Sequence, residues 1–139
     1  MDATAVVREY YRLFNERQLD EVARLVDPQA SFHYVPTRQR LLGRAGYRAL
    51  AAGWLIAFED ALVELTSIEQ EGGDTVRVRF IGRGTHTGPL MLGEHTSIPP
   101  TGRRADLQFT EVLTVRGGLI VKSELDFSLL DLRERLGLV

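Results

Sequence analysis

The spacing of apolar residues changes once along this chain, and that change limits the folds that the chain can adopt. Before Glu59, apolar residues recur every three or four positions, which is typical of helices with one buried face. After Glu59 they alternate with polar residues, which is typical of strands with one buried face. Helices followed by strands that short turns connect predict an α+β fold, with the helices packed on an antiparallel sheet.

The same patterns predict the bounds of the elements. Pro28 is expected to end the second helix, and the glycine pairs at 72–73 and 117–118 are expected to form turns between strands. The predicted helices are 3–17, 20–26 and 45–58, and the predicted strands are a brief one at 30–35 and long ones at 61–70, 75–87, 105–116 and 119–128. Residues 129–138 are expected to form a short helical or irregular tail.

Length and residue types limit the kind of protein. The 139 residues are enough for one domain, 1–139, with a core of its own. The absence of cysteine excludes disulfides, thiolate zinc sites and thiol catalysis. The histidines at 33, 86 and 95 lack the spacing of a metal motif, and no glycine loop before a helix is suited to cradle a phosphate. We therefore expect neither a metal nor an organic cofactor.

Charge and hydropathy exclude two kinds of partner. A net charge of −2 leaves no basic field for nucleic acid. No apolar run approaches the roughly 20 residues that cross a membrane. The N-terminal stretch MDATAVVREYYRLF lacks the basic and apolar regions of a secretory signal. The sequence therefore predicts a cytoplasmic protein whose ligand is a small molecule.

The segment from Gly82 to Arg103 combines glycines, prolines and two of the three histidines. Its glycines permit close approach of the backbone, and its prolines interrupt strand pairing. The apolar stretch from Pro89 to Leu92 is expected to cover a cavity or a partner rather than to face water. The segment is thus a candidate for the lid of a pocket, with a dimer interface or a plain hairpin connection as alternatives.

Several short motifs resemble one protein family. HTGP at 86–89, PPTGR at 99–103, GGLIV at 117–121 and the terminal LRERLGL, in this order of elements, are similar to the SnoaL-like polyketide cyclases, also called ester cyclases. These belong to the nuclear-transport-factor-two-like superfamily. The resemblance implies a cone-shaped fold in which N-terminal helices pack on a strongly curved antiparallel sheet around a pocket. It also implies cofactor-independent chemistry and a homodimer.

The resemblance implies an acid–base group on the last strand, where this chain departs from the family. In the family an aspartate there acts as acid and base in an aldol closure, assisted by a histidine. The position of this aspartate falls on Ser128 in the present chain, and the position of the family's usual tryptophan falls on Glu124. Serine without a base cannot remove a proton from carbon near neutral pH. Glu124 and Asp126 share the strand parity of Ser128, so one of them is the predicted replacement acid. The alternative is that both belong to a solvated strand face, with Leu125 and Phe127 turned inward.

Further residues are candidates for the site. His86 matches the histidine of the family's HTG motif and is the third predicted catalytic residue, because its pKa lies near physiological pH. His33 and Tyr34 alternate along a strand, so at most one of them faces the pocket. Other side chains expected to line the pocket and contact the substrate are Tyr11, Trp54, Met91, Gln108, Phe109 and Ser128.

Three functions fit these expectations. The first is a cofactor-independent cyclase or isomerase acting on a polyketide-like or other hydrophobic natural-product intermediate. The second is an epoxide-opening cyclase or hydrolase that uses the replacement carboxylates as acid and base. The third is a small-molecule binding protein without catalysis, which the loss of the family's aspartate keeps open.

Overall fold

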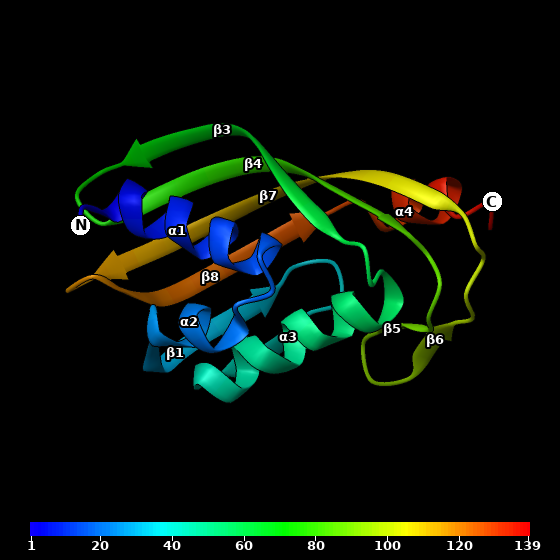
Figure 1. Ribbon diagram of the computed structural model, residues 1–139, viewed down its shortest axis with the longest axis horizontal. Coiled ribbons are helices and arrows are strands. Elements are labelled where there is room, and N and C mark those ends of the chain that lie inside the picture. The colour runs from blue at the N-terminus through cyan, green and yellow to red at the C-terminus, as the bar shows by residue number, and fades with distance from the viewer.

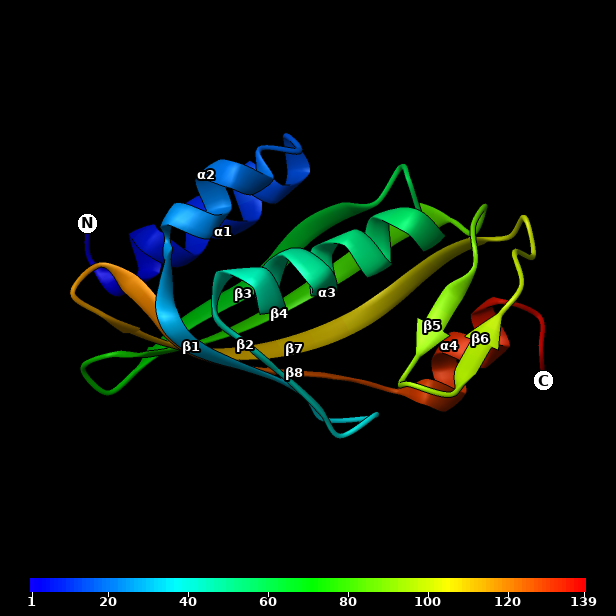
Figure 2. The ribbon, with the colours of Figure 1, turned by 90° about the horizontal axis from the view of Figure 1, so that it is seen from below.

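The computed structural model describes residues 1–139 and shows helices packed against a large curved sheet (Figure 1). Three helices lie on one side of the sheet, and the centre of the other side carries none (Figure 2). The α+β prediction is confirmed. The helices are α1 (Ala3–Asn15), α2 (Leu19–Arg24), α3 (Gly43–Ala57) and α4 (Leu129–Arg135). The strands are β1 (Val26–Tyr34), β2 (Gln39–Leu42), β3 (Leu62–Glu71), β4 (Thr75–Thr85), β5 (Leu90–Leu92), β6 (Thr96–Ile98), β7 (Arg104–Arg116) and β8 (Leu119–Phe127).

The main sheet has six strands in the order β2-β1-β8-β7-β4-β3. Strands β3, β4, β7 and β8 form an antiparallel meander, while β1 pairs with β8 in parallel. The register aligns Tyr34 of β1 with Leu125 of β8, and Leu125 with Glu111 of β7. Residues aligned in this way point to the same face of a sheet, so the three side chains share the concave face.

Several elements differ from the prediction. Helix α2 ends at Arg24, and Pro28 lies within β1 instead of ending a helix. A proline is tolerated there because the pairing of β1 with β8 is interrupted between Val26 and Ser31, so no ladder hydrogen bond is lost. The sequence also did not predict β2 or the hairpin of β5 and β6, which have only three or four residues each.

Apolar residues of the helices and of the concave face form the core. Helix α1 begins at a cap in which the Asp2 carboxylate accepts a hydrogen bond from the backbone N–H of Ala5 at 2.8 Å. The face that α1 buries includes Val6, Val7 and Tyr10. No helix has both the length and the apolar character that crossing a membrane requires.

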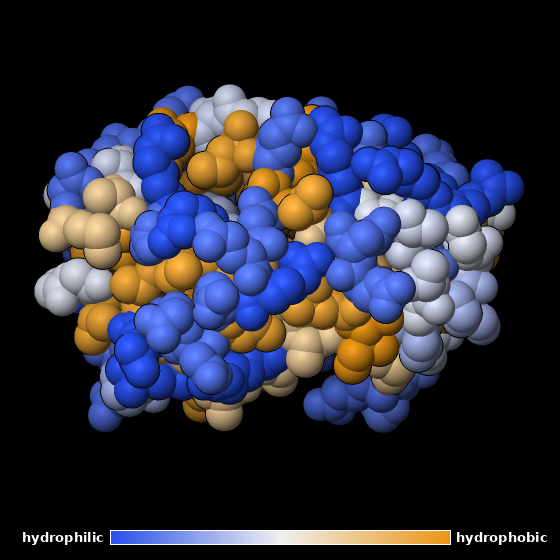
Figure 3. Space-filling model, viewed as in Figure 1, coloured by the Kyte–Doolittle hydropathy of each residue, from blue (hydrophilic) through white to orange (hydrophobic).

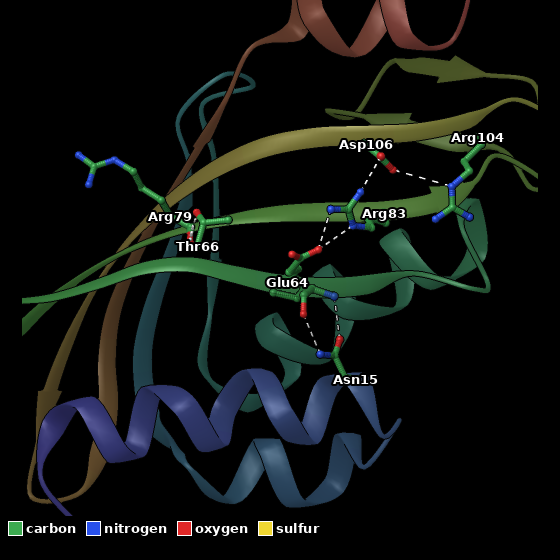
Figure 4. A network of polar contacts seen from close by, with 8 residues as sticks. Asn15, Glu64, Thr66, Arg79, Arg83, Arg104 and Asp106 are labelled. Atoms are coloured by element: carbon green, nitrogen blue, oxygen red, sulfur yellow. Dashed lines mark hydrogen bonds and ion pairs between the residues drawn. The ribbon is translucent and has the colours of Figure 1, made fainter.

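The last residue of α1 also protects the edge of the sheet. The Asn15 side-chain amide donates to the Val63 carbonyl and accepts from the Val63 N–H, both at 2.8 Å (Figure 4). Strand β3 is an edge strand, and unpaired backbone groups on such a strand can recruit another chain. Asn15 therefore occupies the backbone N–H and carbonyl of one edge-strand residue, so that no other strand can pair there, and it fixes α1 against the sheet.

Candidate functional site

A cavity of about 130 Å³ lies between the concave face of the sheet and helices α1 and α3. Of its 24 lining residues, 19 are hydrophobic and ten are aromatic. On the surface that carries the helices, hydrophobic residues show in patches between hydrophilic ones (Figure 3). A mostly apolar cavity with a few polar groups is typical of a small-molecule site.

Glu111 is the only acidic residue in the cavity lining. Its side chain projects from β7, and only 6% of the residue is exposed. The Tyr11 hydroxyl donates to one carboxyl oxygen, and the Ser123 hydroxyl donates to the other at 2.5 Å. Burial raises the pKa of Glu111, and the two hydrogen bonds oppose that rise because they stabilise the carboxylate. The site therefore holds one oriented carboxyl group in apolar surroundings.

A second polar pair belongs to the cavity lining. The indole N–H of Trp54, on α3, donates to the hydroxyl oxygen of Tyr34, at the end of β1. Burial raises the pKa of Tyr34, so its hydroxyl keeps its proton at physiological pH. The cavity thus offers a phenol as a hydrogen-bond donor as well as a carboxyl group.

Arg83 is the only basic residue of the lining, and acidic residues engage its guanidinium (Figure 4). Glu64 accepts from its Nε at 2.9 Å and from one terminal nitrogen at 2.6 Å, and Asp106 accepts from the other at 2.7 Å. Arg83 has the strand parity opposite to that of the buried Val78 and Phe80, so its guanidinium lies with these carboxylates on the convex face and contributes little positive charge to the cavity. Nor do the side chains form any group of three or more His, Asp and Glu residues that could hold a metal ion.

Comparison with known proteins assigns the chain to a family. The family model of the SnoaL-like polyketide cyclases matches residues 4–132. The chain belongs to this family. A search of curated protein sequences found no significant match.

Solved structures share the fold of this SnoaL-like chain over nearly its whole length. AclR, a candidate hydroxylase from Streptomyces galilaeus, is 26% identical with a TM-score of 0.80, over 99% of this chain and 96% of AclR. IdmH, a candidate polyketide cyclase from Streptomyces antibioticus, is 24% identical with a TM-score of 0.82, over 99% of both chains. A Catenulispora acidiphila protein with a ketosteroid isomerase-like fold is 16% identical with a TM-score of 0.76, over 96% of this chain and 93% of that protein. The cone-shaped fold that the family resemblance implied is thus confirmed.

Four of the predicted substrate-binding residues line the cavity of this SnoaL-like chain. They are Tyr11, Tyr34, Trp54 and Phe109. Trp54 packs edge-on against Phe109, with 5.6 Å between the ring centroids. Their position on the concave side follows from the helix and strand periodicities, and their contact with a substrate stays a prediction.

The predicted catalytic carboxylates Glu124 and Asp126 do not reach the cavity, so the expectation that they face the pocket is wrong. In the second half of β8 the buried residues are Ser123, Leu125 and Phe127, whereas Asp126 is exposed and Glu124 is half-buried. The amine of Lys122 lies 3.5 Å from the Glu124 carboxylate on the same outer face. The alternation along β8 was predicted, but its two faces were assigned the wrong way round.

Other candidates of the SnoaL-like site also lie elsewhere. His33 aligns with Glu124 across β1 and β8 and therefore shares the convex face, and Gln108 is exposed on that face. Ser128 caps α4, because its hydroxyl accepts from the backbone N–H of Asp131 at 3.0 Å. Met91 is 55% exposed on the hairpin of β5 and β6. None of these four residues contributes to the cavity lining.

His86 lies behind the cavity wall. It is fully buried and stacks on Phe58, which lines the cavity, with 5.2 Å between the ring centroids. Its Nδ1 accepts from the backbone N–H of Thr101 at 3.2 Å, and burial lowers the pKa of its imidazole. This histidine therefore joins the two ends of the segment from Gly82 to Arg103, and its catalytic role stays a prediction.

The hairpin of β5 and β6 does not form the predicted lid. No residue between His86 and Arg103 lines the cavity. The segment that leads into the hairpin is instead attached to the end of α3. There the backbone N–H groups of Thr87 and Gly88 donate to the Ala57 carbonyl at 3.0 and 3.1 Å. Its buried residues Leu90 and Ile98 belong to the core cluster, so its apolar content serves packing.

Sequence reasoning missed Glu111, although one signal was present. Along β7 the buried positions alternate through 105, 107, 109, 111, 113 and 115, and Glu111 is the only charged residue among them. A lone carboxyl group on an otherwise apolar strand face is costly unless it has partners or a function. That pattern could have identified Glu111 before the structure was known.

Proposed function

We propose that this chain is a cofactor-independent cyclase or isomerase acting on a neutral, hydrophobic, polyketide-like intermediate, with Glu111 as the acid–base group. The observation that carries the proposal is the position of Glu111, the one carboxyl group in an apolar and largely aromatic cavity. Membership of the SnoaL-like polyketide cyclase family supports a ring-closing or isomerising reaction.

The reaction begins when the Glu111 carboxylate removes a proton from a carbon next to a carbonyl group of the substrate. The C–H electron pair forms a C=C bond, and the carbonyl π pair moves to oxygen, giving an enolate. In a cyclase the enolate carbon then attacks a second carbonyl carbon, and the protonated Glu111 returns its proton to the new alkoxide. In an isomerase it returns the proton to a different carbon. Tyr11 and Ser123 hold the carboxyl group in place for both transfers.

A raised pKa suits Glu111 to this task. A carboxyl group with its ordinary pKa is a weak base toward carbon acids, and burial makes it a stronger one. The epoxide-opening alternative called for two carboxyl groups in the pocket, and the cavity lining contains one. The proton-transfer function is therefore the one that the geometry favours.

Hydrogen–deuterium exchange into 2-tetralone, an aromatic ketone with mobile α-hydrogens, tests this proposal. We expect the native protein in deuterium oxide to accelerate the exchange, measured by proton NMR. Glu111→Gln keeps the size of the side chain but removes the base, so the catalysed rate should fall by about a hundredfold or more.

The matched controls are Glu124→Gln and Asp126→Asn, which change the two carboxyl groups outside the cavity. Both variants should exchange 2-tetralone at the native rate. Loss of exchange in either control with retention in Glu111→Gln would sink the assignment of the base. If the native protein binds 2-tetralone without accelerating exchange, the chain is a binding protein and the proposed reaction has to be dropped.

A further inference from the structure

Three consecutive residues of β4, Gly82, Arg83 and Gly84, line the cavity. Side chains of a strand point alternately to its two faces, and the Arg83 side chain lies on the convex face. The cavity wall at this place is therefore the backbone of β4. Both concave positions here are glycine, whereas the preceding concave positions carry the buried side chains of Val78 and Phe80. Glycine thus leaves room at this end of β4 that a side chain would fill.

The room beside Gly82 is occupied by the ring of Phe109, from the neighbouring strand β7. A Cβ added to Gly82 would lie 2.8 Å from one ring carbon of Phe109, and its next nearest neighbours, at 3.4 and 3.7 Å, belong to the same ring. The φ angle of Gly82 is not positive, so its backbone would accept alanine without strain. The Phe109 ring is therefore the group that a larger residue at this position displaces.

Other aromatic rings limit where the Phe109 ring can move. Phe80, on β4, stacks on it almost in parallel, with 4.9 Å between the ring centroids and 9° between the planes. Phe127, on β8, and Trp54, on α3, lie at centroid distances of 5.2 and 5.6 Å. Because Phe109 lines the cavity, the cavity is the one side on which no protein atom opposes a shift. A methyl group on Gly82 therefore pushes the ring into the cavity.

The volume of the cavity is close to that of a site for a single ring. It measures about 130 Å³ and is mostly apolar, and an apolar cavity of about 150 Å³ binds benzene. A shift of Phe109 into this space removes part of the volume. Since a closely packed site has little room to adjust, a six-membered ring would then no longer fit.

We propose that Gly82, by letting Phe109 lie against β4, sets the size of the substrate group that enters the cavity, and that this group is one six-membered ring. The inference rests on the proposed function and names the class of its substrate. That substrate places a single ring in the cavity that Glu111 lines, while its remaining rings or chain stay outside. Gly82 is thus a specificity-determining residue that acts through Phe109.

Binding of benzene tests the inference without requiring turnover. Isothermal titration calorimetry would give its Kd for the native protein, Gly82→Ala, Phe109→Leu and the variant that carries both substitutions. The native protein should bind benzene, and Gly82→Ala should bind it at least about tenfold more weakly, because the displaced ring overpacks the cavity. A cavity with room for more than one ring would still hold benzene in Gly82→Ala.

The double variant shows whether the effect passes through Phe109. Leucine lacks the outer ring carbons of phenylalanine, so the double variant should recover the affinity for benzene that Phe109→Leu has alone. A general distortion of β4 by Gly82→Ala would not be rescued in this way. The matched control is Gly73→Ala, in the turn between β3 and β4, where an added Cβ meets nothing within 4 Å. This control should leave the Kd unchanged.

Native affinity in Gly82→Ala, a double variant as weak as Gly82→Ala, or a native protein that does not bind benzene would overturn the inference. The two proposals fail separately. If Phe109→Leu rescues benzene binding in Gly82→Ala while the native protein does not exchange 2-tetralone, the size limit stands and the proposed function is lost. If Glu111→Gln abolishes exchange but Gly82→Ala binds benzene like the native protein, the base stands and the size limit is lost.

Discussion

Two opposing effects act on the charge of Glu111. Removal from water disfavours the carboxylate, and the hydroxyl donors Tyr11 and Ser123 favour it; removal from water is the larger effect, so the pKa is raised. The folded protein therefore binds this proton more tightly than the unfolded chain does. Stability from this source is complete below the ordinary pKa of 4.5 and is lost as the pH rises through the folded value.

The first stability prediction concerns this residue. Glu111→Gln has no proton to lose, so its free energy of unfolding should increase relative to that of the native protein as the pH rises above 4.5. The difference should grow by about 1.4 kcal/mol for each pH unit until the folded pKa is passed, and then stay constant. Urea unfolding of both proteins at a series of pH values measures it. A difference that shrinks with rising pH would mean that the hydroxyl donors outweigh burial.

At the scale of residues, the sequence predicts which residues alternate along a strand better than it predicts which face of the sheet each side chain occupies. The alternation along β8 was clear, and so was the alternation around Glu111 in β7. Which face of a strand becomes concave depends on where the helices pack, and no single strand contains that information. For this reason Trp54 was placed correctly on the pocket side and the choice between His33 and Tyr34 stayed open, while Glu124 and Asp126 were assigned to the wrong face.

At the scale of elements, the junction of β4 with the end of α3 depends on Gly88. A Cβ at this position would lie 1.9 Å from the Ile56 carbonyl oxygen, which is too close for any side chain. The long strands were predicted because their alternation extends over nine or more residues. The short hairpin was not, because three-residue strands form through packing such as this rather than through a pattern in the sequence.

Gly88→Ala should destabilise the protein by about 1–3 kcal/mol, since the end of β4 has to move away from α3. The matched control is Gly53→Ala within α3, where a Cβ meets nothing within 4 Å. This control should be stabilising by about 0.5–1 kcal/mol, because alanine favours a helix more than glycine does. Chemical denaturation gives both values. Equal stabilities of the two variants would show that the junction tolerates displacement.

At the scale of the whole molecule, the convex face of the sheet has no helix over its centre (Figure 2). Ile81, Thr110 and Val112 are half-buried there. The strand register places a charged residue on each side of Thr110, Arg79 on β4 and Asp126 on β8. A patch of small and apolar side chains between charges of both signs can pair with a second copy of itself. We propose that two copies of the chain pair through this face.

Sedimentation velocity at micromolar concentration should then give a mass twice that of the 15.6 kDa chain. Thr110→Glu would bury an additional carboxylate beside Asp126 in the interface and should weaken association by at least about tenfold, because removing a further charge from water is costly. Leu130→Glu, on α4, changes an exposed apolar residue outside this region and should leave the mass unchanged. A native protein that sediments as a monomer would refute the pairing.

The parallel pairing of β1 with β8 has a consequence for how the site is assembled. Strand β1 ends at Tyr34, and its partner β8 spans Leu119–Phe127, so the 84 residues from 35 to 118 lie between the two strands. Contacts between residues so distant in sequence form late in folding, because a long loop has to close first. Tyr34 and Glu111 therefore come to line one cavity only after β8 has inserted between β1 and β7. A nascent chain that has not yet exposed Phe127 outside the ribosome should have α1, α2, α3 and its first hairpins, but not the complete cavity.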